Sequence, residues 1–311
     1  MNNKNNTYKK TNSNNHNYKK KKKKRNLYAY ADVILIIVLI IILIFIFKPK
    51  NKENKVDQNK EEGQEKINIT EPQNTKQQYY FYKEENKERY EKYKQEHKEL
   101  DEEKIIIYVN IGLDKEFYTD IKDSPNKHTN TVLVNKYNYL GDDYVPNNLT
   151  KINKKYAISD DKYMEKEAAI AFEEMAKKAK EDGYNIIAIS TYRSYKYQTT
   201  LYNNYAKSDG KEKADRYSAR AGYSEHQTGL AVDVSDGKKS YTKFKDTKEF
   251  NWMQENCYKY GFILRYTEEN EFITGYMSEA WHYRYVGKEI ATYIHNNPMT
   301  FEEYYVRFID K

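Results

Sequence analysis

Hydrophobic residues are spaced very differently in successive parts of the chain. Residues 33–47 are fifteen consecutive aliphatic or Phe residues, and the run extends back to Leu27 if Asp32 lies at an interface. About 20 such residues cross a bilayer as a helix. Residues 48–104 are mainly Lys, Glu, Asn and Gln, too polar to bury a core. The pattern therefore predicts a transmembrane anchor at 27–47 and a polar stalk, or linker, at 48–104.

After residue 104 the pattern becomes that of a folded domain, predicted to span 105–311. Apolar residues between Met164 and Gly183 recur at steps of three and four, which predicts an amphipathic helix. A β-prone run at 105–109 and apolar runs at 186–191 and 230–234 predict strands, and further helices are expected at 195–205, 250–260 and 288–295. This order favours an α+β fold with a small antiparallel sheet flanked by helices.

The charge of the chain is concentrated at its beginning. Ten of the 54 Lys and Arg residues lie before residue 26, where there is no acidic residue, so the rest carries 44 basic and 47 acidic residues. A slightly acidic folded part argues against nucleic-acid binding. A basic segment before an apolar run predicts a cytoplasmic tail at 1–26 and a domain outside the cell membrane, anchored by a single pass.

A cleaved signal peptide is the alternative for this N-terminal region. Signal peptides also have a short apolar stretch after positive charges, but Lys48-Pro49-Lys50 offers no small-residue pair for cleavage. An uncleaved anchor is therefore favoured. The single cysteine, Cys257, excludes an intramolecular disulfide, and its amphipathic surroundings predict a small buried side chain rather than a catalytic thiol.

Two segments carry candidate metal ligands. His226 lies seven residues before Asp233, which shares one face of the predicted strand with Ala231, and His282 follows about fifty residues later. Neutral His nitrogen and Asp oxygen are zinc ligands, and a catalytic zinc site has three protein ligands and one open position. Each residue alone has an ordinary structural interpretation. As a set they predict a metal site, because an Asp among Leu, Ala and Val needs a positive partner.

Two further side chains have the chemistry to act beside such a metal. Glu279 lies three residues before His282, and it becomes a general base and then a general acid if it contacts the attacking water. Arg193 follows the apolar run at 186–191, where its guanidinium suits a carboxylate or an oxyanion. A surface arginine paired with an acidic residue is an equally good interpretation of Arg193.

Four motifs together resemble the D-alanyl-D-alanine carboxypeptidases of the VanY type, which are LAS metallopeptidases of peptidase family M15B. The resemblance covers about residues 131–290, and the tail, the anchor and the stalk lie outside it. The motifs are Tyr192-Arg193-Ser194 with Gln198, Ser224-x-His226-x-x-Gly229-x-Ala231-x-Asp233, Gly261-Phe262-Ile263-Leu264-Arg265, and Glu279-x-Trp281-His282-x-Arg284-Tyr285-Val286-Gly287.

The resemblance implies a LAS-type site with one zinc ion, in which each matching residue has a role. It implies that His226, Asp233 and His282 bind the zinc, that Glu279 is the catalytic acid/base and that Arg193 holds the oxyanion or the substrate carbonyl. It also implies that Ser224 and Gln198 bind the terminal carboxylate or the stem peptide. Ala221 and Ala280 depart from the family, whose members often have proline there, and this puts loop geometry in doubt more than chemistry.

The activity implied is zinc-dependent hydrolysis of the terminal D-Ala-D-Ala bond of peptidoglycan stem peptides. Two alternatives stay open. An L,D-carboxypeptidase acting on tetrapeptide stems carries nearly the same motifs. A non-catalytic, zinc-containing wall-binding module would keep the ligands but have no chemical need for Glu279.

Overall fold

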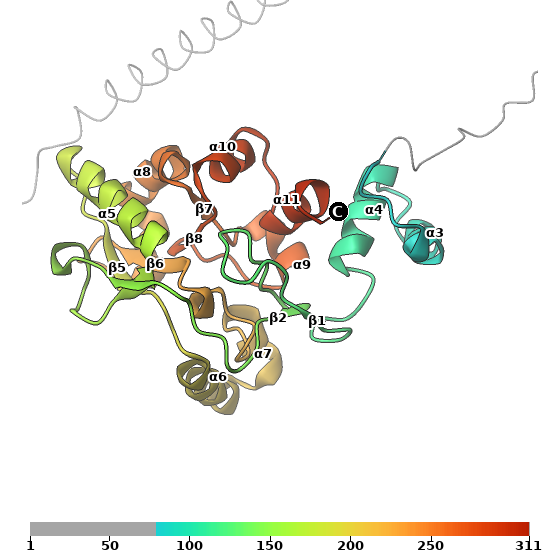
Figure 1. Cartoon of the computed structure of the whole chain (residues 1–311), viewed down its shortest axis with the longest axis horizontal. Helices are drawn as coiled ribbons and strands as arrows, with labels where there is room; N and C mark the ends of the chain where they lie inside the picture. Colours follow the sequence, from blue (N-terminus) through green and yellow to red (C-terminus); the bar gives the residue numbers. More distant parts are fainter. Residues whose placement is uncertain (1–78, 311) are drawn as a thin grey trace, which may run out of the picture. The chain divides into compact units, whose positions relative to one another are not determined.

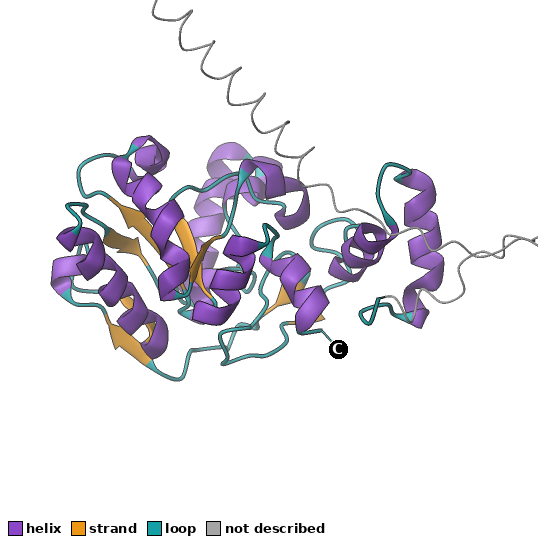
Figure 2. Cartoon of the chain, turned by 90° about the horizontal axis from the view of Figure 1, so that it is seen from above, coloured by secondary structure: helices purple, strands orange, loops and turns teal. Residues whose placement is uncertain are grey.

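The computed structural model describes residues 79–310 (Figures 1 and 2). Its centre is a four-stranded antiparallel sheet in the order β5–β6–β8–β7. These strands span Ile187–Ser190, Ala231–Ser235, His282–Tyr285 and Phe262–Leu264. Two smaller sheets pair β1 (Lys122–Asp123) with β2 (Asn138–Tyr139) and β3 (Leu149–Lys151) with β4 (Tyr163–Glu165). The predicted α+β fold with a small antiparallel sheet is confirmed.

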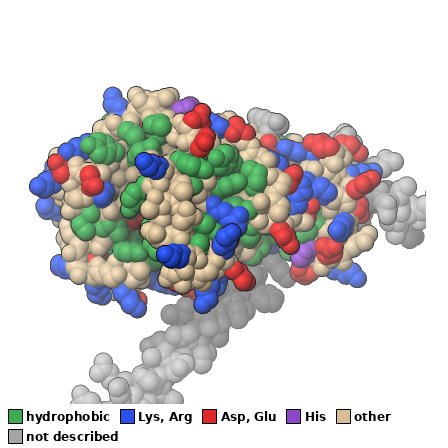
Figure 3. Space-filling model, turned by 90° about the horizontal axis from the view of Figure 1, so that it is seen from below, with side chains coloured by type: hydrophobic (Ala, Val, Ile, Leu, Met, Phe, Trp, Pro, Cys, Tyr) green, Lys and Arg blue, Asp and Glu red, His purple; other side chains and the backbone are tan. Residues whose placement is uncertain are grey.

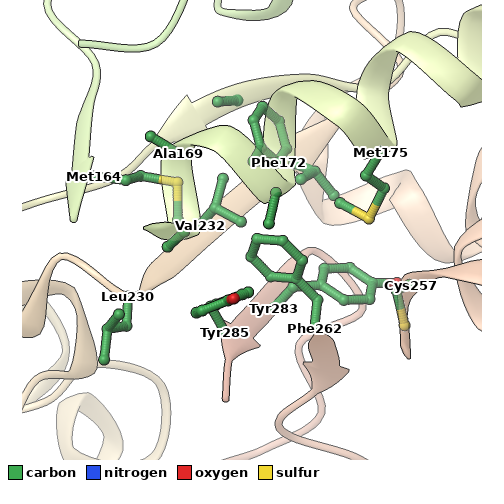
Figure 4. Packing of buried hydrophobic residues seen from close by; sticks show 14 of the residues in the cluster. Met164, Ala169, Phe172, Met175, Leu230, Val232, Cys257, Phe262, Tyr283 and Tyr285 are labelled. Atoms are coloured by element: carbon green, nitrogen blue, oxygen red, sulfur yellow. The ribbon is translucent and has the colours of Figure 1, made fainter. Parts of the chain in front are cut away.

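Helix α5 (Lys166–Glu181) covers one face of the central sheet. Its buried side chains Phe172 and Met175 meet aromatic residues of the sheet, and the Phe172 and Phe262 ring centroids are 6.4 Å apart (Figure 4). Tyr283 and Tyr285 of β8 belong to the same cluster. Because side chains alternate along a strand, the other two residues of β8, His282 and Arg284, point to the other face of the sheet.

Three of the remaining helical segments follow the sequence pattern. The predicted helices at 195–205, 250–260 and 288–295 correspond to α6, to α8 continued by η5, and to α10. The bounds are α6 (Tyr195–Asp209), α7 (Lys211–Tyr217), α8 (Lys248–Asn256), α9 (Glu271–Thr274), α10 (Lys288–Asn296), η2 (Lys154–Tyr156), η3 (Glu225–Thr228), η4 (Tyr241–Asp246), η5 (Cys257–Tyr260) and η6 (Glu268–Asn270).

The strand predicted at 105–109 is wrong, because these residues lie in helix α4 (Glu102–Ile111). The side chain of Asp101 caps the helix by accepting a hydrogen bond from the backbone N–H of Lys104, and Gly112 ends it with a φ of 110°. The β-branched run suggested a strand, but these capping signals prevail. After the polar first turn, residues 105–111 are buried on every side of the helix, which stabilises it.

The prediction that residues up to 104 form a polar stalk is also wrong for residues 79–104. They contain η1 (Glu84–Asn86) and α3 (Lys87–Glu96), and α3 packs against α4. Phe81, Tyr90 and Tyr93 are buried in one cluster with the isoleucines of α4. The aromatic residues between the charges were the signal for this packing. The predicted segments 1–26 and 27–47, and the rest of the stalk, lie outside the described residues.

A last helix, α11 (Phe301–Phe308), was not predicted. Thr300 and Glu303 form a capping box at its start, in which each side chain accepts a hydrogen bond from the other residue's backbone N–H. Helix α11 packs against α4, so the last helix of the described chain lies beside one of its earliest helices (Figure 1). The capping box was readable in the sequence as Thr-x-x-Glu before Tyr304 and Tyr305.

The described surface carries charged side chains of both signs. Basic and acidic side chains are interspersed on the face shown in Figure 3, with hydrophobic groups among them. Within residues 79–310 no helix is long and apolar enough to cross a bilayer.

Cys257 is buried and unpaired, and burial raises the pKa of its thiol to about 12. The predicted structural role of this cysteine therefore stands.

Replacing Ile107 by Ala should destabilise the fragment 79–310 by about 2–5 kcal/mol, because Ile107 is fully buried in α4 and the substitution leaves a cavity. Denaturant unfolding of the fragment measures the change. Ile170→Ala is the matched control, since Ile170 is 51% exposed on α5. Equal, small effects of both changes would show that α4 does not belong to the cooperative core.

Candidate metal centre and cleft

The pairing of β6 with β8 places two predicted ligands side by side. Asp233 lies directly opposite His282 in the antiparallel ladder. Their neighbours Val232 and Tyr283 face the core on α5, so the two polar side chains share the opposite face. The Nδ1 atom of His282 lies 3.0 Å from Oδ1 of Asp233.

His226 reaches the same place from the turn η3. Gly229 ends this turn with a φ of 72°, and a Cβ there would lie 3.0 Å from the backbone nitrogen of Glu165, so glycine is required. The His226 Nδ1–H donates to the carbonyl oxygen of Thr191 at 2.7 Å. That hydrogen bond leaves the lone pair on Nε2, which lies 3.3 Å from Oδ2 of Asp233.

These three residues meet the requirements of a site for one metal ion. One ligand atom from each of His226, Asp233 and His282 lies within 4.8 Å of the others. The buried Nε2 of His226 has no hydrogen-bond partner among residues 79–310, although an unpaired buried nitrogen is costly. Two imidazoles and one carboxylate form a donor set for zinc, and three protein ligands leave one coordination position open. The residues therefore fit zinc.

The electrostatics keep two of the three ligands, His226 and Asp233, in metal-binding forms. Burial and the charge of Arg193 lower the pKa of His226 to about 4, so this imidazole is neutral. Burial opposes ionisation of Asp233, but His226 and His282 hold the pKa of its carboxyl well below the usual range. A neutral imidazole and an ionised carboxylate are the forms that bind a metal.

The side chain of Glu279 lies beside the ligands but is too far from them for a hydrogen bond. Its Oε2 is 3.8 Å from Nδ1 of His282. The backbone N–H of His282 donates to the carbonyl oxygen of Glu279, and this tight turn brings two residues three positions apart to one site. Burial raises the pKa of Glu279 to about 8, although the charge of His282 acts against it. Such a carboxyl can both accept and release a proton near neutral pH.

A cleft of about 760 Å³ opens onto this cluster. Arg193, Gln198 and Ser224 line it together with Glu279 and the three ligands, so the structure brings all seven predicted site residues to one cavity. The Nε of Arg193 and the Oε1 of Gln198 are buried and have no hydrogen-bond partner in the part of the chain that the structure describes. Unpaired polar atoms at a cleft wall are available to a ligand.

Sequence reasoning missed Glu225, which supports His282 from behind. The Nε2–H of His282 donates to Oε2 of Glu225 at 3.1 Å, so in the neutral, metal-binding form of His282 the lone pair lies on Nδ1, toward Asp233. Glu225 is fully buried and is held by Arg265 at 2.8 Å and Arg284 at 3.1 Å. The signal was a pair of arginines within strand-forming apolar segments, since buried arginines need carboxylates.

Comparison with known proteins gives the same motifs a family context. The model of the VanY family, described as D-alanyl-D-alanine carboxypeptidase, matches residues 161–288. The putative carboxypeptidase YodJ of Bacillus subtilis strain 168 is 38% identical over 205 residues, covering 62% of this chain and 75% of that protein. A D-alanyl-D-alanine carboxypeptidase of Enterococcus faecium is 34% identical, covering 56% of this chain and 57% of that protein.

A solved structure is also similar to this chain. The LD-carboxypeptidase LdcB, whose structure was described for its peptidoglycan recognition, is 40% identical with a TM-score of 0.54. The match covers 60% of this chain and 94% of that one. The family-model match at 161–288 includes all three predicted ligands and Glu279.

The zinc affinity of this site should increase with pH. Burial lowers the pKa of His282, but its hydrogen bonds with Asp233 and Glu225 raise it to about 9 in the metal-free protein. Below that pH zinc must displace a proton, so its Kd should fall by about tenfold per pH unit between pH 6 and 8. Competition titrations with a chelator measure this slope. A Kd independent of pH would contradict the proton-holding arrangement of His282.

Replacing Glu225 by Gln should weaken zinc binding by about 10- to 100-fold, because the carboxylate that orients His282 and increases its basicity is lost. The same competition titration gives the ratio. Glu268→Gln is the control, because this substitution removes the same charge from a side chain that is 68% exposed. If both variants bind zinc as the unmodified protein does, Glu225 does not support the site.

Proposed function

We propose that this protein releases the C-terminal D-alanine of peptidoglycan stem peptides. The chain belongs to the VanY-type D-alanyl-D-alanine carboxypeptidase family and is a zinc metallocarboxypeptidase. The observation that carries the proposal is the cluster of His226, Asp233 and His282 with Glu279 beside it at the base of a cleft. The carboxypeptidase of Enterococcus faecium and the peptidoglycan-recognising LdcB support this substrate class.

His226, Asp233 and His282 hold the zinc ion in this proposal. When bound, zinc acts as a Lewis acid that activates water and polarises the carbonyl group of the scissile bond. The protein keeps these ligands fixed through hydrogen bonds from behind, from His226 to Thr191 and from His282 to Glu225. Fixed ligands need little rearrangement when a substrate enters.

Glu279 moves the proton that hydrolysis requires. Its Oε2 faces the ligand cluster, within reach of a water molecule that attacks the carbonyl carbon. The carboxylate accepts a proton from that water and then donates it to the nitrogen of the leaving D-alanine. The alternative of a non-catalytic binding module is not favoured, since a buried carboxyl at this position has no role in binding the wall.

Arg193, Gln198 and Ser224 bind the substrate on the cleft wall. The guanidinium of Arg193 has a buried, unpaired Nε and suits either the carbonyl oxygen or the terminal carboxylate. Gln198 is fixed by a hydrogen bond from its Nε2 to the carbonyl oxygen of Ala219, and its free Oε1 accepts a donor from the ligand. A substrate thus satisfies atoms that are otherwise unpaired.

The D-Ala-D-Ala bond of pentapeptide stems is the first candidate for the scissile bond. The description of the family model and the name of the enterococcal relative support it. The second candidate is the L,D bond of tetrapeptide stems, because the chain is 40% identical to the LD-carboxypeptidase LdcB over 94% of that protein. Both reactions release D-alanine, so the two differ only in the residue before the scissile bond.

We also propose that the enzyme is anchored in the cell membrane and faces outward. The support is the apolar run at 33–47 with the basic segment before it, which favours a single-pass anchor with residues 1–26 in the cytoplasm. An outward-facing domain would meet peptidoglycan directly. Protease digestion of intact cells would remove the domain in this orientation and leave it protected in the opposite one.

The zinc-loaded protein should release D-alanine from a pentapeptide ending in D-Ala-D-Ala, and the Glu279→Gln variant should retain zinc but lose at least about a hundredfold in turnover. Enzymatic detection of free D-alanine and metal analysis of the same samples provide the two measurements. Parallel reactions with a tetrapeptide stem decide between the two bonds. Near-normal turnover of Glu279→Gln would remove this residue from the mechanism, and failure to release D-alanine from both peptides would refute the substrate class.

A further inference from the structure

The carboxylate behind His282 is itself part of a larger buried charge network. Arg265 bridges two carboxylates, with its Nε 2.8 Å from Oε1 of Glu225 and its Nη2 2.6 Å from Oε1 of Glu302. These three side chains are at most 1% exposed. A continuous path of charged hydrogen bonds therefore leads from Glu302, on helix α11, through Arg265 and Glu225 to the metal ligand His282.

Glu302 lies outside the region that the family model matches. That match ends at residue 288, whereas Glu302 lies in the first turn of α11, a helix that packs against α4. Asn135 also donates to the same oxygen of Glu302, at 3.2 Å. An element that is remote from the cleft is thus connected to the metal ligands by charge rather than by hydrophobic packing alone.

The charges of the network balance only when all four ionised members are present. Glu225 and Glu302 carry two negative charges, Arg265 and Arg284 carry two positive charges, and His282 is neutral when it serves as a ligand. Burial alone would lower the pKa of Arg265, but the carboxylates of Glu302 and then Glu225 raise it well above its ordinary value. Arg265 is therefore shared between the two carboxylates.

Stability alone does not account for this arrangement. Buried ion pairs are often no more stable than apolar residues of the same volume. Here the Nη1 of Arg265 and the Oε2 of Glu302 remain buried without a hydrogen-bond partner among residues 79–310, which adds a further cost. The network is costly to bury, and it ends on a metal ligand. We therefore expect it to serve the function of that ligand.

We propose that Glu302 is a positioning residue for the zinc site, acting through Arg265 and Glu225 on His282. Without the charge of Glu302, Arg265 interacts with Glu225 alone and draws its negative charge away from the Nε2–H of His282. The imidazole then becomes a weaker ligand. The unbalanced positive charge of the network also repels a cation at the site, so both effects lower zinc affinity.

The test compares Glu302→Gln with Glu303→Gln in the full-length protein. Glu303 neighbours Glu302 on α11 and accepts from the backbone N–H of Thr300 at 2.7 Å. A Gln can accept the same hydrogen bond, so the change removes one negative charge at the start of α11 without changing the charge network. Competition titration with a chelator gives the Kd for Zn²⁺. Absorption of the Co²⁺-substituted protein reports on the ligand field, which a merely structural defect in α11 does not alter.

The expected result is a loss of zinc affinity of about 2- to 30-fold in Glu302→Gln, the range of couplings transmitted through such networks, together with shifted Co²⁺ bands. Glu303→Gln should lower thermal stability slightly at most, through the lost charge at the helix start, and keep the affinity and the spectrum. Unchanged affinity and spectrum in Glu302→Gln, or an equal loss in Glu303→Gln, would overturn the proposal. Both readouts need no substrate, so they are independent of the proposed peptide specificity.

A second variant decides the question if Glu302→Gln does not fold. Arg265→Lys keeps the positive charge but lacks the planar fork that contacts both carboxylates at once. It should therefore show the same direction of change in zinc affinity and in the Co²⁺ spectrum. Zinc binding in Arg265→Lys that equals that of the unmodified protein would refute the path from α11 to His282.

Discussion

The antiparallel pairing of β6 with β8 is the constraint on which the site depends. It sets Asp233 opposite His282 on one face and Val232 opposite Tyr283 on the other. A shift of one residue in either strand would turn its ligand toward α5 and its apolar neighbour toward the cleft. The hydrophobic core and the metal site are therefore specified by the same register, and packing against α5 stabilises the geometry of the ligands.

Charged side chains on the polar face of the sheet lie one behind another, starting from the metal ligands. The ligands themselves face the cleft, Glu225 lies behind His282, and Arg265 and Arg284 lie behind Glu225. Each buried charge is acceptable only because the next one compensates it. Burial opposes ionisation of Glu225, but the two arginines hold its pKa well below the usual range, so it remains a hydrogen-bond acceptor for His282.

The sequence was most informative where a local pattern determines the structure. The three- and four-residue spacing in α5 and the alternation in β6 predicted these elements, and the family motifs named the seven residues that meet at the cleft. It was misleading at 105–109, where a run of isoleucines suggested a strand and helix caps prevailed. Glu225 could not be assigned, because its role depends on arginines that approach it only after folding.

The folded domain extends beyond the residues that carry the family motifs. Motifs alone place its core at about 131–290, and the family model at 161–288. However, α4 and α11 pack together outside both ranges, and Glu302 of α11 forms an ion pair with the arginine behind the zinc site. Aromatic residues of 79–104 bury the other side of α4. The compact unit that contains the metal ligands therefore extends over the described residues 79–310, well beyond the segment that carries the chemistry.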